Sequence, residues 1–151
     1  MAQAKKNLKT YSIIVLGLAV LTLLNLLFEL FFGELNGELN NATIPAGAPE
    51  NVVMIARIFI LVISLLFLLP QFYIGIKGLK IVKKPDSSRG HIVWGMILIV
   101  FTAIGLISPF LAFFQGNGDA FGNVAEFFSI AVDVFVLVEY VKHAKAVRDK
   151  A

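Results

Sequence analysis

The sequence predicts an all-α integral membrane protein, an antiparallel four-helix bundle with short loops and both termini in the cytoplasm. Hydrophobic residues make up 58% of the 151 positions and charged residues only 15%, against roughly 45–50% and 25% in soluble proteins. The apolar residues are gathered into long stretches, and most basic residues lie between these stretches. No internal repeat divides the chain, so residues 1–151 are predicted to form a single polytopic membrane domain.

Four apolar stretches are long enough to cross a bilayer, which takes about 20 residues for roughly 30 Å of hydrocarbon. Backbone polar groups must be satisfied internally in hydrocarbon, so each stretch is predicted to be a helix. Polar segments rich in Gly, Pro and Asn connect the stretches. Pro70 and Pro109 lie inside the second and third stretches, where a missing N–H can bend a helix. The predicted spans are residues 11–32, 52–76, 91–114 and 123–141.

The distribution of Lys and Arg predicts the orientation. Twelve of the 13 basic residues lie in the N-terminal tail, the loop 77–90 and the C-terminal tail, and the loops 33–51 and 115–122 have none. Cytoplasmic segments carry such an excess of positive charge. An even number of spans puts these three segments on one side, which we expect to be the cytoplasmic side of a bacterial plasma membrane. The Tyr and Trp residues lie at the same span ends, as interfacial anchors do: Tyr11, Tyr73, Trp94 and Tyr140.

Polar residues within the spans recur at helical spacing, which predicts that each helix turns one polar face toward the interior of the bundle. These intramembrane candidates are Asn25 and Glu29 in the first span, Arg57, Ser64 and Gln71 in the second, and Glu126 and Asp133 in the fourth.

Three of these residues, Glu29, Arg57 and Glu126, are expected at a similar height in the outer leaflet. Arg57 is the one basic residue outside the three basic segments, and we expect one or both carboxylates to neutralise it. A compensated ion pair needs no ligand, so a packing role is favoured over a functional one.

Asp133 is predicted to lie near the middle of the membrane, where a charged Asp costs about 2.5–3.5 kcal/mol. Each Leu, Ile, Phe or Val of the same span returns about 0.3–0.6 kcal/mol, which leaves a narrow margin for insertion. No cationic partner is evident for Asp133 in the sequence. Two interpretations stay open: a polar group that hydrogen-bonds between helices, and a titrating site for a proton or cation.

Glu139 and His143 are four residues apart on one helical face, and His91 begins the third span on the same side of the membrane. Two imidazoles and a carboxylate suit a divalent metal, and His91 could sense pH. Polar groups at a wet interface are more often simply solvated, so we expect no cofactor and a solvated His91. The sequence has no Cys, which excludes disulfides and thiol chemistry.

Three classes of function are compatible with this pattern. The favoured class is transport or permeation of an ion, proton or small solute along the polar face, in a homo-oligomer. The alternative is an accessory or assembly subunit whose polar face pairs with another membrane protein. An enzyme is disfavoured, because only Glu139, His143 and His91 offer interfacial chemistry. Besides the lipid bilayer itself, the basic loop 77–90 suits anionic lipid, and no nucleic acid is expected as a partner.

Overall fold

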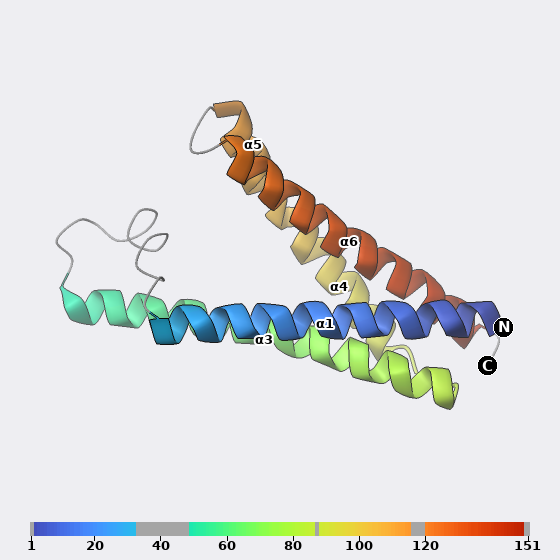
Figure 1. The fold of residues 1–151 in the computed structure, drawn as a ribbon. Coiled ribbons are helices and arrows are strands. Elements are labelled where there is room, and N and C mark those ends of the chain that lie inside the picture. The colour runs from blue at the N-terminus through green and yellow to red at the C-terminus, as the bar shows by residue number, and fades with distance from the viewer. Residues whose placement is uncertain (1, 33–48, 87, 116–119, 150–151) are drawn as a thin grey trace. The chain divides into compact units, whose positions relative to one another are not determined.

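A computed structural model describes residues 2–32, 49–86, 88–115 and 120–149 (Figure 1). Within these ranges the chain is helical and contains no strand, so the predicted all-α class is confirmed. Side chains are described in the same ranges except at 29–32, 50, 53, 56, 57, 60 and 120. The helices are α1 (Ala2–Phe32), α3 (Glu50–Lys83), α4 (Gly90–Gly105), α5 (Ile107–Gln115) and α6 (Ala120–Arg148).

Three helical stretches in the described part of the chain are long and apolar enough to cross a membrane: Ala2–Phe28, Leu61–Lys83 and Gly90–Gln115, the last formed by α4 and α5 together. They correspond to three of the four predicted spans and are consistent with an integral membrane protein. The helix α6 is long but is not among them. Its carboxylates, at Glu126, Asp133 and Glu139, make it less apolar than the other three.

Most helices extend further than the apolar stretches that predicted them. The helix α1 begins before its apolar stretch, at Ala2. The helices α3 and α6 continue beyond theirs, to Lys83 and Arg148 respectively. The apolar stretch marks only the part of a helix that suits hydrocarbon, while Ala, Lys and Arg favour continuation of the helix beyond it. Basic residues occupy the last turns of α3 and α6, where positive charge complements the helix dipole.

The two intrahelical prolines have different effects. Pro109 coincides with the break between α4 and α5, where the N–H of Leu106 donates to the carbonyl of Ala103 at 3.1 Å. Proline lacks an N–H and its ring clashes with the carbonyl four residues earlier, here that of Gly105, the last residue of α4. Pro70, by contrast, lies inside α3, which continues to Lys83.

The chain divides into two compact units. Unit 1 comprises Met1–Leu16 and Pro70–Ala151, and unit 2 comprises Gly17–Leu69. Unit 1 therefore holds the start of α1, the end of α3 and all of α4, α5 and α6, with α4 packed along α6 (Figure 1). Unit 2 holds the rest of α1 and α3, whose buried side chains include Ala19 and Leu68.

The core of unit 1 lies at the ends of the helices near the termini and the α3–α4 loop. On α6 the buried residues begin at Val136, and the described residues before it are exposed or half-buried. On α4 they occupy its first half, from His91 to Leu98. Among the described residues of unit 1, the buried hydrophobic ones at this end are Leu8, Val15, Ile74, Ile81, Ile92, Leu98, Val136, Leu137, Tyr140, Val141, Ala144 and Val147. Pro109 of α5 is buried as well.

Glycines allow the helices of this core to approach one another closely. A Cβ on Gly78 of α3 would overlap the Ser12 hydroxyl and lie 2.8 Å from Cε2 of Tyr140. A Cβ on Gly95 of α4 would lie 2.7 Å from Cγ2 of Val141. Real Cβ atoms do not come this close, so small residues set the distance between the helices, as they do in many membrane bundles.

Replacement of Gly78 tests this packing. Gly78→Ala should destabilise the protein by about 1–3 kcal/mol, because the added methyl group overpacks a filled contact. Gly17→Ala is the matched control, since a Cβ there would meet nothing within 4 Å and Ala favours a helix interior by roughly 1 kcal/mol. Thermal loss of helical circular dichroism in detergent measures both. Equal effects of the two substitutions would contradict the close approach at Gly78.

Candidate functional site

Tyr140 of α6 is the centre of the packed end of unit 1. Its side chain is fully buried, and its hydroxyl donates a hydrogen bond to the backbone carbonyl of Ile74 in α3 at 2.7 Å. The ring lies against Gly78 of α3 and Gly95 of α4. Tyr140 thus joins three helices through one polar bond and two glycine contacts.

From the sequence, Tyr140 was expected only as an interfacial anchor, and its junction with α3 and α4 was not predicted. One signal was present: Gly75 and Gly78 are three residues apart in α3, on one helical face. A Cβ on Gly75 would lie 2.5 Å from Cγ of Leu16, so this small face also receives α1.

His91 packs against Tyr140. Its ring stands at 86° to that of Tyr140, with ring centroids 6.4 Å apart. The side chain is 0% exposed, and neither Nδ1 nor Nε2 has a hydrogen-bond partner among the described residues. The expectation of a solvated His91 is therefore wrong. Tyr140 of α6 packs against the ring, and spacing along one helix does not reveal such a contact between helices.

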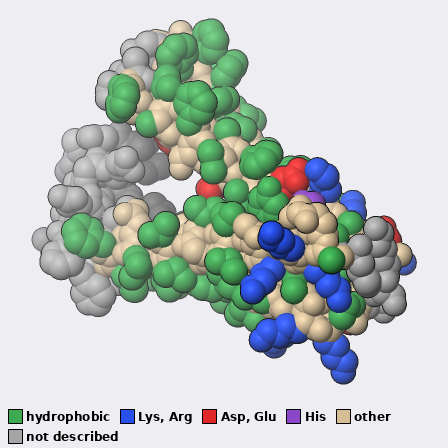
Figure 2. All heavy atoms as spheres, turned by 45° about the vertical axis from the view of Figure 1, so that its right-hand side comes forward, with side chains coloured by type: hydrophobic (Ala, Val, Ile, Leu, Met, Phe, Trp, Pro, Cys, Tyr) green, Lys and Arg blue, Asp and Glu red, His purple; other side chains and the backbone are tan. Residues whose placement is uncertain are grey.

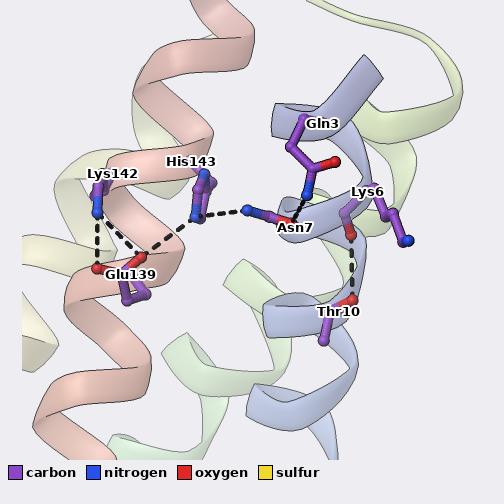
Figure 3. Close-up of polar contacts among 7 residues, drawn as sticks. All are labelled: Gln3, Lys6, Asn7, Thr10, Glu139, Lys142 and His143. Carbon is purple, nitrogen blue, oxygen red and sulfur yellow. Dashed lines mark hydrogen bonds and ion pairs between the residues drawn. The ribbon is translucent and has the colours of Figure 1, made fainter. Parts of the chain in front are cut away.

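A polar cluster, defined here as Asn7, Glu139, Lys142 and His143, joins α1 to α6 (Figure 3). Nε2 of His143 lies 3.3 Å from Nδ2 of Asn7 and 3.3 Å from Oε2 of Glu139. Lys142 pairs with Oε1 of Glu139 at 3.0 Å. The ring of Tyr11 stacks on His143, with centroids 5.6 Å apart.

The two partners of Nε2 in His143 make opposite demands. The Asn7 amide nitrogen donates, so it needs a lone pair on Nε2, whereas the Glu139 carboxylate accepts and needs a proton there. Gln3 donates to Oδ1 of Asn7 at 2.9 Å, which holds the amide with its nitrogen toward the imidazole. The cluster therefore satisfies one of these two contacts fully in each protonation state of His143.

The metal site considered from the sequence is only partly assembled. The structure brings Glu139 and His143 together, but His91 lies apart from them in the contact with Tyr140. Within the described ranges, no three His, Asp or Glu residues form a group able to hold a metal ion.

Asp86 fixes the loop between α3 and α4. The ammonium group of Lys77 donates to its Oδ2 at 2.8 Å, and the backbone N–H of Ser88 donates to its Oδ1 at 2.9 Å. These two hydrogen bonds, that of Lys77 above all, hold the pKa of Asp86 below its ordinary value of 3.8. Asp86 thus ties the loop before α4 back to Lys77 near the end of α3.

Asp133 is half-buried on α6, one turn before the buried residues Val136 and Leu137. Its carboxylate has no hydrogen-bond or ion-pair partner among the described residues. Seven residues, or about 10 Å along the helix, separate Asp133 from Tyr140 on the same face of α6. Glu126, seven residues before Asp133 on the same face, is exposed.

The remaining predicted residues are less informative. The side chains of Glu29 and Arg57 lie outside those that the structure describes, so their pairing with Glu126 stays a prediction. Ser64 and Gln71 are half-buried, in unit 2 and unit 1 respectively, and Asn25 is exposed in unit 2.

The fold and these polar residues define the class as a small all-helical protein with helices suited to a bilayer. No protein-family model, no curated protein and no solved structure matches the chain.

Asp86 predicts a specific acid sensitivity. Its folded-state pKa is lowered, so its ionised form stabilises the fold above the ordinary value of 3.8, and this contribution is lost as the pH falls through the lowered pKa. Asp86→Asn should therefore flatten the dependence of the melting temperature on pH between about pH 5 and pH 2. Lys77→Gln should act in the same direction. An unchanged pH profile in Asp86→Asn would contradict a stabilising role for this pair.

Proposed function

We propose that the chain is a four-span integral membrane protein of a bacterial plasma membrane, with both termini in the cytoplasm. Twelve of the 13 Lys and Arg residues belong to the segments that make up unit 1. The contact of Asn7 with His143 joins the start of α1 to the end of α6, and the bond of Tyr140 to Ile74 joins α6 to α3. Lys and Arg side chains gather on one part of the surface (Figure 2). Positive charge collected on one side supports a cytoplasmic placement of that side.

In this proposal α6 is the fourth span, although it is less apolar than the other three. Its contacts with α4 and α5 support insertion, because helix partners compensate polar groups that a lone helix would expose to lipid. The collected basic residues would face anionic headgroups, each worth about 1 kcal/mol near the surface.

Cysteine labelling tests the topology without a background, because the chain has no Cys. In intact cells, a membrane-impermeant maleimide should label Asn51→Cys, near the outer end of α3, and should not label Ser88→Cys in the α3–α4 loop. Permeabilised cells should label both positions. Labelling of Ser88→Cys from outside would reverse the proposed orientation.

We further propose that Asp133 is the proton- or cation-binding group of a permeation path. The single observation that supports it is a half-buried carboxylate that has no partner among the described residues and lies just before the buried part of α6. An intramembrane carboxylate of this kind is costly to retain, and such groups commonly serve proton and ion pathways. Four helices enclose little space, so the path would run along this face or between protomers of a homo-oligomer.

An accessory role is the second candidate, favoured by the surface of α6 before Asp133. Glu126 and Ser129 are both exposed there and share a helical face with Asp133. In an accessory subunit this polar face would pair with a second membrane protein instead of lining a path.

Substitution of Asp133 tests the transport proposal. Purified protein in liposomes should carry protons or Na⁺ down an imposed gradient, measured with an entrapped pH-sensitive or Na⁺-sensitive dye. Asp133→Asn should abolish this flux, because an amide neither releases a proton nor attracts a cation. Asp133→Glu should retain part of it, and Asp149→Asn, the same chemical change on the exposed residue after α6, should retain all of it.

Flux that is unchanged in Asp133→Asn would overturn the assignment of this residue. If the wild-type protein carries no flux, and native mass spectrometry of the complex from its own membrane finds a stoichiometric second membrane protein, the accessory role replaces transport. Native mass spectrometry also reports whether the chain is a homo-oligomer.

A further inference from the structure

The structure describes two buried polar side chains, those of Ser12 and His91, and they differ in how they are satisfied. The hydroxyl of Ser12 donates to the carbonyl of Leu8 at 2.7 Å. Both ring nitrogens of His91 are without a partner in the described part of the chain. Buried polar atoms have a hydrogen-bond partner in the large majority of cases, so two such atoms without one on a single ring need an explanation.

The location of His91 gives this ring influence over the packed end of unit 1. It contacts Tyr140, whose hydroxyl bond to Ile74 connects α6 to α3. Its helix neighbour Gly95, one turn further along α4, lies against Val141 and Tyr140. Movement of the His91 ring would therefore remove a wall of the site that holds Tyr140.

Neutral and protonated His91 make different demands on this environment. A neutral imidazole has one N–H donor and one acceptor, and protonation replaces the acceptor with a second N–H and adds a charge. Within the described part of the chain, neither ring nitrogen has a hydrogen-bond partner, and a buried charge without such a partner is strongly unfavourable. The imidazolium would fit only if the ring moved out or if water entered.

The charges around His91 favour one direction of movement. The groups that act on it electrostatically are Asp86 in the α3–α4 loop, Lys77 on α3 and Arg148 on α6, and the phenol of Tyr140 faces it from α6. Asp86 is the only anion among them. An imidazolium would be drawn toward Asp86, five residues earlier in the chain, in competition with Lys77, and repelled by Lys77 and Arg148.

We propose that His91 is a proton-binding site that controls the packing of α3, α4 and α6 at Tyr140. With the imidazole neutral, the ring stays buried and the junction is closed. With the proton bound, the ring leaves Tyr140 toward Asp86 and the junction loosens. That protons reach His91 from the cytoplasm rests on the proposed topology, whereas the site itself does not depend on topology or on transport.

The sole tryptophan, Trp94, lies one turn after His91 on α4 and reports on this site. Wild-type protein in nanodiscs should show a one-proton change in Trp94 fluorescence between about pH 8 and pH 5, a range that brackets the ordinary histidine pKa of about 6.5. Amide hydrogen exchange at the start of α4 and at residues 136–141 should become faster as the pH is lowered over the same range. Neither readout requires flux, so a negative result here would count against the His91 proposal and not against the transport proposal.

Two variants decide the assignment. His91→Phe keeps a ring of similar shape but cannot take a proton, so it should abolish the fluorescence change and raise the melting temperature at about pH 5 relative to wild type, because it removes the buried unpaired nitrogens. His143→Gln, which replaces the only other histidine, should leave the change intact. A change that persists in His91→Phe or vanishes in His143→Gln would overturn the proposal.

A third outcome would overturn it as well. If the wild-type protein shows no fluorescence or exchange change in this range, and ¹⁵N NMR of the His91 ring shows hydrogen-bonded nitrogens throughout, then a bound water satisfies the ring and His91 has a packing role. His91→Gln, which retains a polar group of hydrogen-bonding capacity, would then preserve the stability of the wild-type protein better than His91→Phe.

Discussion

The hydrogen bond from Tyr140 to the carbonyl of Ile74 is the interaction on which the packed end of the molecule depends. A buried phenol must find an acceptor, and this one finds it on the backbone of another helix. To reach it, α6 must approach α3 so closely that only a glycine fits at position 78. The approach of α4 to α6 likewise requires a glycine at position 95. Between apolar helices in lipid there is little hydrophobic drive to associate, so such specific contacts determine which helical faces meet.

The same junction explains why the basic segments lie together. Tyr140 is two residues from Lys142, Gly78 is next to Lys77, and His91 directly follows the basic loop. Packing at Tyr140 therefore brings the ends of α3, α4 and α6 to one place, and the contact of Asn7 with His143 adds the start of α1. Repulsion among the collected cations is reduced at two points, by Asp86 beside Lys77 and by Glu139 beside Lys142.

The sequence predicted the helical class and three of the apolar helical stretches, because apolar length is a local property. It indicated a possible bend at Pro70 and at Pro109 alike, whereas only Pro109 coincides with a break between helices. It underestimated helix length wherever a helix continues beyond its apolar stretch, as α6 does to Arg148. It did not predict the burial of His91 or the bond of Tyr140, because both depend on contacts between helices. Candidates such as Asp133 were located along the chain by spacing alone, but whether a neighbour pairs with a carboxylate is decided by other helices.

The contrast between Asp133 and Tyr140 follows from where the packing of α6 begins. From Val136 onward α6 is fixed by close contacts, and a carboxylate inside that region would need a permanent hydrogen-bonding partner. Far before it, where Glu126 is exposed, a carboxylate would meet solvent, headgroups or lipid. Asp133 stands at the boundary, close enough to the core to be half-buried and free of any partner that the described residues provide. A change in its charge would therefore disturb no bond that the described side chains make, whereas a proton on His91 would act directly on the contact with Tyr140.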